Sequence, residues 1–430
     1  MPKRVSLPRW MVIGICFLGC NMTMGFAFGS FGTLLASTEQ HFGISRPAAS
    51  LGMAFVTLAV GGLAPFLGNV MQIVPVRYAM AGGCLLSAVG YFGLATLNYY
   101  PLALFMFILT GAGISLSGII GPLTVISRWY TDGRGAALSI AELPIFILVM
   151  PFVVGGVLPH VGRSAILVTV AVIFVAIAPL FLLLRDPPAN GFSATGDGAA
   201  TTWQVVAKET GGGSALTNLQ ILSMRPFWLL SLAMGIMSGA SLAFYVHIVA
   251  FAMGRGMTLL AAGGMLSAYG AAGLVGVLLW GRIADWRGPP QTLVLTSFLL
   301  TLLWLAMILV PTTGLYVVAA GLGLCATPML TLHGAALSAL IPSNSASRAM
   351  GLSYGIKLPF LFVAAPAIAF IFESTGGYTA PFAVIAAIMA LCCLLFIVLS
   401  MTTGQQHNSR VPQGRRLEPS LSREKLPTKT

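Results

Sequence analysis

Charged side chains are scarce in this sequence. Of its 430 residues, 22 are Lys or Arg and 10 are Asp or Glu, so that 7% are charged. A soluble globular domain carries roughly 25% charged residues. A water-soluble particle of this size would therefore lack the charge to cover its surface. This shortage excludes a soluble enzyme, a nucleic-acid-binding protein and a disordered chain.

Cysteine pairs, metal-ligand spacings and catalytic clusters are also missing. The six cysteines all lie in apolar stretches, at positions Cys16, Cys20, Cys84, Cys325, Cys392 and Cys393. They are typical of small hydrophobic residues in helices, and they predict no disulfide framework, metal site or cofactor. No loop combines a nucleophile with a base, and the longest one, 185–225, has neither His nor Cys. A membrane-embedded enzyme is therefore disfavoured.

Apolar stretches make up most of the chain. A helix crosses the hydrocarbon core of a bilayer with about 20 apolar residues. Stretches of that length predict twelve spans, at residues 10–36, 48–70, 78–97, 101–126, 135–158, 164–184, 226–252, 258–280, 291–310, 314–340, 349–372 and 380–402. The first stretch is too long for a signal peptide, so we expect it to be a membrane span.

Two polar segments divide the chain into domains. Residues 185–225 are predicted to be a cytoplasmic linker, and residues 404–430 a disordered basic cytoplasmic tail. The linker separates a first six-helix bundle, residues 1–184, from a second, residues 226–403.

Basic residues are distributed unevenly between the two sides of the predicted membrane. If both termini are cytoplasmic, 18 of the 22 cations lie inside, three lie outside (Arg46, Arg163 and Arg255), and Lys357 falls within a span. Cytoplasmic loops carry the excess of Lys and Arg in membrane proteins. The sequence thus predicts a multi-pass protein of the plasma membrane, or bacterial inner membrane, with both termini in the cytoplasm and the lipid bilayer around it.

The two halves of the chain are related by a weak repeat. At a shift of 213 residues Gly43 aligns with Gly256, and at one residue more Arg134-Gly-Ala-Ala-Leu-Ser aligns with Arg348-Ala-Met-Gly-Leu-Ser. Because six is an even number, the matched spans cross the membrane in the same direction. Parallel six-helix repeats are typical of one architecture of secondary transporters. We therefore predict an all-α membrane protein with twelve transmembrane helices in two pseudo-symmetric six-helix bundles.

The loop after the eighth span carries a specific motif. It reads Gly281-Arg282-Ile283-Ala284-Asp285-Trp286-Arg287-Gly288 and resembles the G-x-L-A-D-R-x-G signature of the major facilitator superfamily. Glycine permits close helix approach or a tight turn, and the acid can pair with Arg or a helix N-terminus. The first-half copy keeps a Gly and an Arg but has Gln72 and Pro75 in place of the acid and the second glycine. We predict a conformational gate, called the motif gate below, formed by Gly281, Asp285, Arg287, Gly288, Gly68 and Arg77.

Further motifs resemble the monocarboxylate transporter and oxalate/formate antiporter branch of that superfamily. They are Gly29-Ser-Phe-Gly-Thr, Phe42-Gly-Ile-Ser-Arg46, Arg128-Trp129-Tyr130, Leu184-Arg185-Asp186-Pro187-Pro188 and Glu373-Ser-Thr-Gly-Gly-Tyr378. Antiporters of this branch carry a substrate-binding lysine where Lys357 stands. The resemblance implies a secondary active transporter of a small organic anion, a monocarboxylate, that works by alternating access as a monomer.

Three alternatives remain open: the identity of the coupled ion, a different substrate class, and a protein that does not transport. The branch's proton-coupled members have a lysine in span one and an acid/arginine pair in span eight, which this chain lacks. A proton and a counter-anion are therefore both open as the coupled partner, and so are symport and antiport. A drug or other amphiphile/proton antiporter of the same superfamily is the second alternative, although the acids that such proteins use in spans one and four are missing. A non-transporting sensor with the same fold is the third.

Two formally charged residues fall inside predicted spans, Glu142 and Lys357. A charge at a helix centre costs about 3 kcal/mol on insertion scales, so each is a functional hypothesis. Both precede a Leu-Pro pair, and they follow Arg134 and Arg348 by eight and nine residues. We expect Lys357 to bind the substrate and Glu142 to be its charge partner or the coupling residue. The alternative for each is that it snorkels to the interface.

Polar residues in other spans complete the predicted substrate site. The spans that contain the two histidines usually line the central cavity in proteins that this chain resembles. Hydrogen bonding within the helix packing is the alternative role for every candidate. The candidates are His247, His333, Asn21, Tyr245, Tyr269 and Tyr354.

Overall fold

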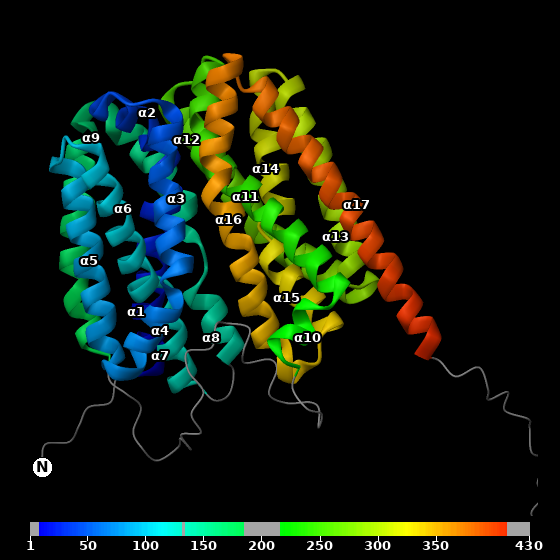
Figure 1. Cartoon of the computed structure of the whole chain (residues 1–430). Coiled ribbons are helices and arrows are strands. Elements are labelled where there is room, and N and C mark those ends of the chain that lie inside the picture. Colours follow the sequence, from blue (N-terminus) through cyan, green and yellow to red (C-terminus); the bar gives the residue numbers. More distant parts are fainter. Residues whose placement is uncertain (1–7, 131–133, 185–215, 411–430) are drawn as a thin grey trace, which may run out of the picture.

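The computed structural model describes residues 8–130, 134–184 and 216–410, and these residues form helices and short turns without a strand (Figure 1). Most of the predicted linker and tail, and residues 1–7 and 131–133, lie outside the described residues. Of the linker, a short helix is described, α10 (Asn218–Leu222), which begins with a capping box at Thr217.

The first half of the chain folds into six helical rods. In chain order they are α1 (Arg9–Met24) with η1 (Gly25–Gly29) and α2 (Phe31–Phe42); α3 (Arg46–Gly62) with α4 (Ala64–Ile73); α5 (Val76–Thr96); α6 (Tyr100–Ile114) with η2 (Ser115–Ile120) and α7 (Gly121–Trp129); α8 (Arg134–Ala141) with the first part of α9 (Ile145–Leu182); and the second part of α9. The chain changes direction inside α9 at Gly162, where φ is 77° and ψ is 167°.

The second half repeats this pattern with fewer breaks. Its rods are α11 (Arg225–Gly254), α12 (Leu259–Arg287), α13 (Pro289–Leu309), η4 (Thr312–Gly314) with α14 (Leu315–Ala326) and α15 (Met329–Leu340), α16 (Ser343–Thr375) and α17 (Thr379–Arg410). Ten described helical stretches are long and apolar enough to cross a membrane. The turn inside α9 adds one crossing and α3–α4 adds another. The described helices thus match the twelve predicted spans.

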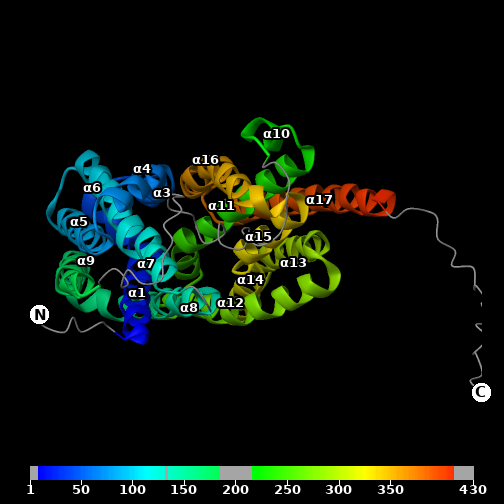
Figure 2. The same cartoon turned by 90° about the horizontal axis from the view of Figure 1, so that it is seen from below.

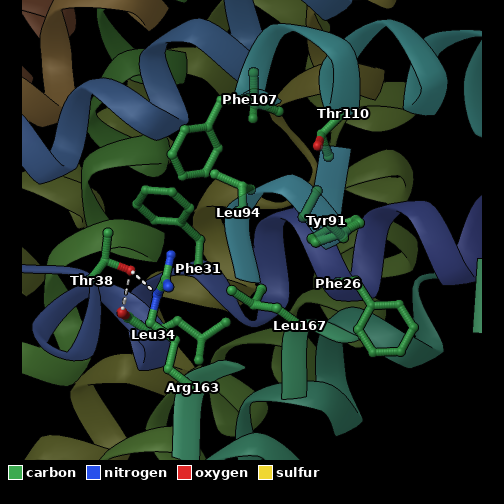
Figure 3. A pocket seen from close by; sticks show the side chains of 12 residues that line it. Phe26, Phe31, Leu34, Thr38, Tyr91, Leu94, Phe107, Thr110, Arg163 and Leu167 are labelled. Carbon is green, nitrogen blue, oxygen red and sulfur yellow. Dashed lines mark hydrogen bonds between the residues drawn. The ribbon is translucent and has the colours of Figure 1, made fainter. Parts of the chain in front are cut away.

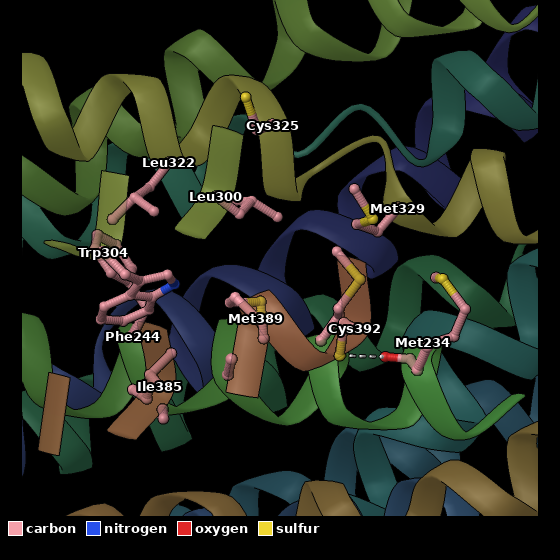
Figure 4. Close-up of a cluster of buried hydrophobic side chains, with 14 of the residues drawn as sticks. Met234, Phe244, Leu300, Trp304, Leu322, Cys325, Met329, Ile385, Met389 and Cys392 are labelled. Atoms are coloured by element: carbon pink, nitrogen blue, oxygen red, sulfur yellow. Dashed lines mark hydrogen bonds between the residues drawn. The ribbon is translucent and has the colours of Figure 1, made fainter. Parts of the chain in front are cut away.

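Each half has its own hydrophobic core. Phe174 and Phe181 are fully buried in the first core, and Phe244, Trp304 and Phe382 pack together in the second (Figure 4). Lipid tails are as apolar as these side chains, so close packing rather than transfer from water holds such helices together. The first core also includes Leu242, Val246 and Ala365 of the second half, so the two halves are joined where these side chains pack.

Left-handed glycines mark equivalent turns in the two halves. Gly43 (φ 61°) and Gly256 (φ 84°) are 213 residues apart, and Gly162 (φ 77°) and Gly376 (φ 71°) are 214 apart. A side chain with a Cβ is strained at these backbone angles. These separations equal the two shifts of the sequence repeat, so the repeat is also present in the backbone.

The four glycine turns lie on one side of the molecule, called the turn face here. The opposite side, the tail face, carries the start of α1, α10 and the end of α17 (Figure 1). On the turn face the halves are in close contact through α2 with α11, α3 with α16 and α9 with α12. Toward the tail face, α4 packs on α3, α5 and η2, and α8 packs on α1 and α7, so the halves diverge (Figures 1 and 2). The conformation is closed on the turn face and open on the tail face.

A bulky residue at Gly263 should destabilise the closed face. A Cβ there would collide with the carbonyl oxygen of Pro151 in the other half. Overpacking of this kind costs roughly 1–3 kcal/mol, so Gly263→Leu should lower the thermal unfolding temperature of the detergent-purified protein. Gly254→Ala is the control, because a Cβ at Gly254 meets nothing within 4 Å. An unfolding temperature of Gly263→Leu equal to that of the control would contradict this contact.

Candidate functional site

Lys357 lies in a buried polar cluster between α15 and α16. Its Nζ is 2.8 Å from Nδ1 of His333, and Nε2 of the same ring is 3.0 Å from Oγ of Ser353. The three side chains are exposed by 3% or less. An ammonium group only donates hydrogen bonds. Nδ1 must therefore accept from Lys357, and Nε2 carries the hydrogen and donates it to Ser353.

The ammonium group of Lys357 lacks a carboxylate partner among the described residues. The ion pair that the structure does contain joins Arg46 to Glu39, which lie on the turn face. A buried charge that has a neutral hydrogen-bond partner alone remains electrostatically incomplete. An incoming anion is the chemical group that would complete it.

Open space adjoins this cluster on the side that faces the first half. Leu358 lies on that side and faces α3, since a Cβ built on Gly61 of α3 would be 2.9 Å from Cδ1 of Leu358. Tyr354 lies one helical turn nearer the tail face, 36% exposed, with its ring centroid 4.7 Å from the Lys357 ammonium. Gly351 and Gly355 are exposed there, and a Cβ on either would meet nothing within 4 Å.

Glu142 lies in a helix break and not within a continuous span as the sequence suggested. Residues 142–144 separate α8 from α9, and the Glu142 side chain is exposed. The cause is local, since Pro144 has no N–H and disfavours helical angles at Leu143. Lys357 also precedes a Leu-Pro pair, yet α16 continues through Pro359. The structure contains no ion pair between Glu142 and Lys357, so the predicted partnership is absent in this conformation.

Asn21 compensates for that break. Its Oδ1 accepts a hydrogen bond from the backbone N–H of Phe146 at 3.0 Å, and its Nδ2 donates to the carbonyl of Phe17 at 3.0 Å. The first N–H groups of a helix have no partner within it. The buried amide of Asn21 thus caps the first turn of α9, which is the structural alternative to the predicted role in substrate binding.

His247 belongs to a polar chain at the turn face and not to the Lys357 cluster. This chain, called the turn-face lock, consists of Glu39, Arg46, Tyr378 and His247. The Nε atom of Arg46 donates to Glu39 at 2.8 Å and its Nη1 to the hydroxyl of Tyr378 at 3.1 Å. That hydroxyl lies 3.3 Å from Nδ1 of His247. The backbone N–H of Arg46 also donates to Glu373 at 2.9 Å.

The turn-face lock joins the two halves. Glu39 and Arg46 come from the first half, and the remaining members come from the second. Nε2 of His247 is 2.9 Å from the carbonyl oxygen of Ala365, which ties α11 to α16. Arg46 and Tyr378 end two of the family-like motifs in the sequence, which by themselves predict no role for either residue. Their pairing requires a contact across 332 residues of sequence, which spacing along the chain does not reveal.

Tyr269 lies in the core of the second half. Its ring stacks on Phe244 at a centroid distance of 4.6 Å and meets Tyr245 edge-on at 5.3 Å. The side chain is 2% exposed. The structure therefore gives Tyr269 a packing environment apart from the open side of α16.

The second-half residues of the motif gate are not engaged across the halves. Gly288 has φ 88°, as a tight turn requires. Asp285 is exposed and has no ion-pair partner within the described residues, and Arg287 lies over the ring of Trp286 at 5.1 Å. A Cβ on Gly281 would meet nothing within 4 Å, so the close approach expected there is absent.

The first-half residues of the motif gate also stay within their own half. Gly68 is buried in α4, and the guanidinium of Arg77 lies 4.6 Å from the ring centroid of Tyr78. Nε of Arg77 is buried without a hydrogen bond. The two parts of the motif gate also belong to different sides of the interface between the halves, since α3, which leads into α4, packs on α16, whereas α12 packs on α9.

Comparison with known proteins identifies the family. The model of the Major Facilitator Superfamily matches residues 17–356, more than half of the chain. The fold is similar to the crystal structure of a bacterial homologue of the human lysosomal transporter Spinster, solved in an inward-facing, unoccupied conformation. The TM-score is 0.72 at 12% identity over 93% of this chain and 99% of that one. A search of curated proteins found no match.

Loss of the Arg46 side chain should open the turn face. Arg46→Gln removes the ion pair with Glu39 and the hydrogen bond to Tyr378. With spin labels at the exposed residues Gln40 and Thr379, pulsed electron paramagnetic resonance should then give a broader distance distribution with a longer mean.

Arg255→Gln is the matched control for this change. Arg255 is also a turn-face cation, but it donates to the carbonyls of Val310 and Ile308 within its own half. The control should keep the distance distribution of the unmodified chain. If Arg46→Gln does so too, the turn-face lock does not hold the halves together.

Proposed function

The chain belongs to the major facilitator superfamily, and we propose that it carries a small organic anion, a monocarboxylate, that binds at Lys357. Membership in this family makes it a secondary transporter in a membrane, not an enzyme. The buried ammonium without a carboxylate partner is the observation that carries the substrate proposal.

Charge and space together favour a monocarboxylate. Lys357 has three N–H donors, of which His333 takes one. A carboxylate that enters beside Gly351 and Gly355 can accept from the others once the ring of Tyr354 moves aside. A single cation neutralises one carboxylate, so a dianion would leave one charge uncompensated in a low-dielectric site.

Alternating access follows from the two contact regions between the halves. In the present conformation the turn-face lock is closed and the motif gate is separated. Rocking of the two bundles would open the first, and it would bring α4 with Gly68 toward α16 and the end of α12 with Gly281 and Asp285 toward α8. A substrate shifts the equilibrium between the two conformations only to the extent that its contacts differ between them. Glu142, exposed at the helix break, is the candidate for a residue whose charge changes during this cycle.

We propose that the protein lies in the plasma membrane, or the bacterial inner membrane, with the tail face in the cytoplasm. This assignment rests on the excess of basic residues in the loops of that face. The conformation described above is then open to the cytoplasm.

Neutralising Lys357 should abolish binding of the anion. Lys357→Met shortens the side chain by one atom and removes its charge. Loss of one hydrogen bond to a charged group weakens binding by about 10- to 100-fold. Small monocarboxylates should raise the unfolding temperature of the unmodified protein, neutral amides of the same shape should not, and Lys357→Met should respond to neither.

Two further variants make this test specific. Lys357→Arg keeps the charge with a different shape and should retain partial binding at best. Arg282→Gln removes an exposed cation of α12 and should bind as the unmodified chain does. Normal uptake of a monocarboxylate by Lys357→Met would overturn the organic-anion assignment, and stabilisation by cationic amphiphiles in its place would favour a drug/proton antiporter.

Thiol labelling of intact cells should establish the orientation. The six native cysteines are buried, so they give little background. A cysteine at the exposed turn-face position Gln40 should react with a membrane-impermeant reagent, and one at Asn218 of α10 should react only after permeabilisation. The opposite pattern would reverse the orientation.

A further inference from the structure

A second buried cation lies inside the first bundle, outside the site proposed above. Arg163 follows the Gly162 turn of α9 and is 8% exposed. Its Nε donates to Oγ1 of Thr38 at 3.2 Å, and its guanidinium carbon lies 5.2 Å from the ring centroid of Phe42. Nη1 is shielded from solvent and has no hydrogen-bond partner.

The charge of Arg163 is not balanced by any described carboxylate. The acid nearest to its partner Thr38 is Glu39, which is already paired with Arg46. An unpaired buried charge is costly, and buried charges in proteins are paired or hydrogen-bonded. Arg255 shows the alternative solution, because its Nη1 and Nη2 both donate to backbone carbonyls. Arg163 lacks such acceptors for Nη1.

A cavity lies beside the guanidinium of Arg163. It has a volume of about 40 Å³ and is lined by residues of α2, α3, α5, α6 and α9 and of η1, among them Thr38, Tyr91, Phe107 and Thr110 (Figure 3). A single water molecule needs about 10–15 Å³ measured in this way. The cavity therefore has room for an anion of one to three heavy atoms and is too small for a substrate with a long carbon chain.

We propose that this cavity binds a small monovalent anion of the size of chloride, which pairs with Nη1 of Arg163. Oγ1 of Thr38 donates to the carbonyl of Leu34 at 2.9 Å and accepts from Nε of Arg163. Thr38 thus orients the guanidinium and does not itself donate to the anion. The bound anion completes the coordination of a charge that lies between α2 and the second part of α9.

The proposal places a stabilising ion next to the turn-face lock. Thr38 precedes Glu39 on α2, so the anion and the lock act on the same end of that helix. Occupancy should stabilise the fold by binding the folded state alone. This effect is independent of Lys357, which lies in the other half.

The test uses the full-length chain purified in detergent, with chloride as the probe. Thermal unfolding of the Lys357→Met variant is followed while chloride replaces gluconate at constant ionic strength. This variant lacks the proposed carboxylate site, and gluconate is too large for the cavity. We expect the unfolding temperature to rise as chloride increases, with bromide acting similarly. Indifference of this variant to both anions would overturn the proposal.

Variants connect the effect to Arg163. In the Lys357→Met background, Arg163→Gln should remove the chloride dependence, whereas Arg255→Gln should keep it. Thr38→Val retains the cation but removes the hydrogen bond that fixes its Nε, so the chloride midpoint should shift. If Arg163→Gln does not fold, Thr38→Val decides alone, and an unchanged midpoint would refute the site. In a crystal soaked with bromide, the anomalous signal should lie beside Nη1, and its absence there would refute the site as well.

Discussion

Lipid cannot solvate a charge or a free backbone group, so every such group in this protein must find its partner inside the chain. Arg46, Lys357 and Arg163 meet this constraint to different degrees. Arg46 is fully paired with Glu39 and Tyr378, and it holds the two halves together. Lys357 has a neutral histidine, and Arg163 has a single hydroxyl. Lys357 and Arg163 are therefore the positions where a ligand can supply the negative charge that the described residues do not.

The same constraint explains why each bundle is tightly packed. Within each half, backbone approaches at small residues, such as Gly323 against the carbonyl of Tyr269, leave little room for sliding. Between the halves, contact is concentrated at the turn face and ends near Gly61 and Leu358. A molecule built in this way can change its accessibility by rotating about that contact without repacking either core.

The sequence predicts the fold well because the signals for it are local. Twenty-residue apolar stretches and glycines at repeat positions each depend on nearby residues, and they recur as the helices and the left-handed turns at Gly43 and Gly256. The site is predicted less completely because its geometry depends on contacts between distant residues. Lys357 and His333 were both candidates, but their direct contact is visible only in the structure. The sequence predicts Glu142 inside a span because the same Leu-Pro pair follows Glu142 and Lys357. This pair interrupts the helix between α8 and α9, whereas α16 continues through it.

The remaining asymmetry between the halves is informative about the mechanism. At the break after α8, the amide of Asn21 takes the place of helical hydrogen bonding, whereas the corresponding stretch of α16 stays helical and carries the lysine. Breaks of this kind at mid-depth are tolerated only where protein or a water-filled cavity satisfies the backbone. The first half thus supplies a bendable rod with an exposed acid, and the second half supplies a rigid rod with a buried base. In the proposed transport cycle, the rigid rod would keep the binding charge in place while the broken rod would follow the changing cavity.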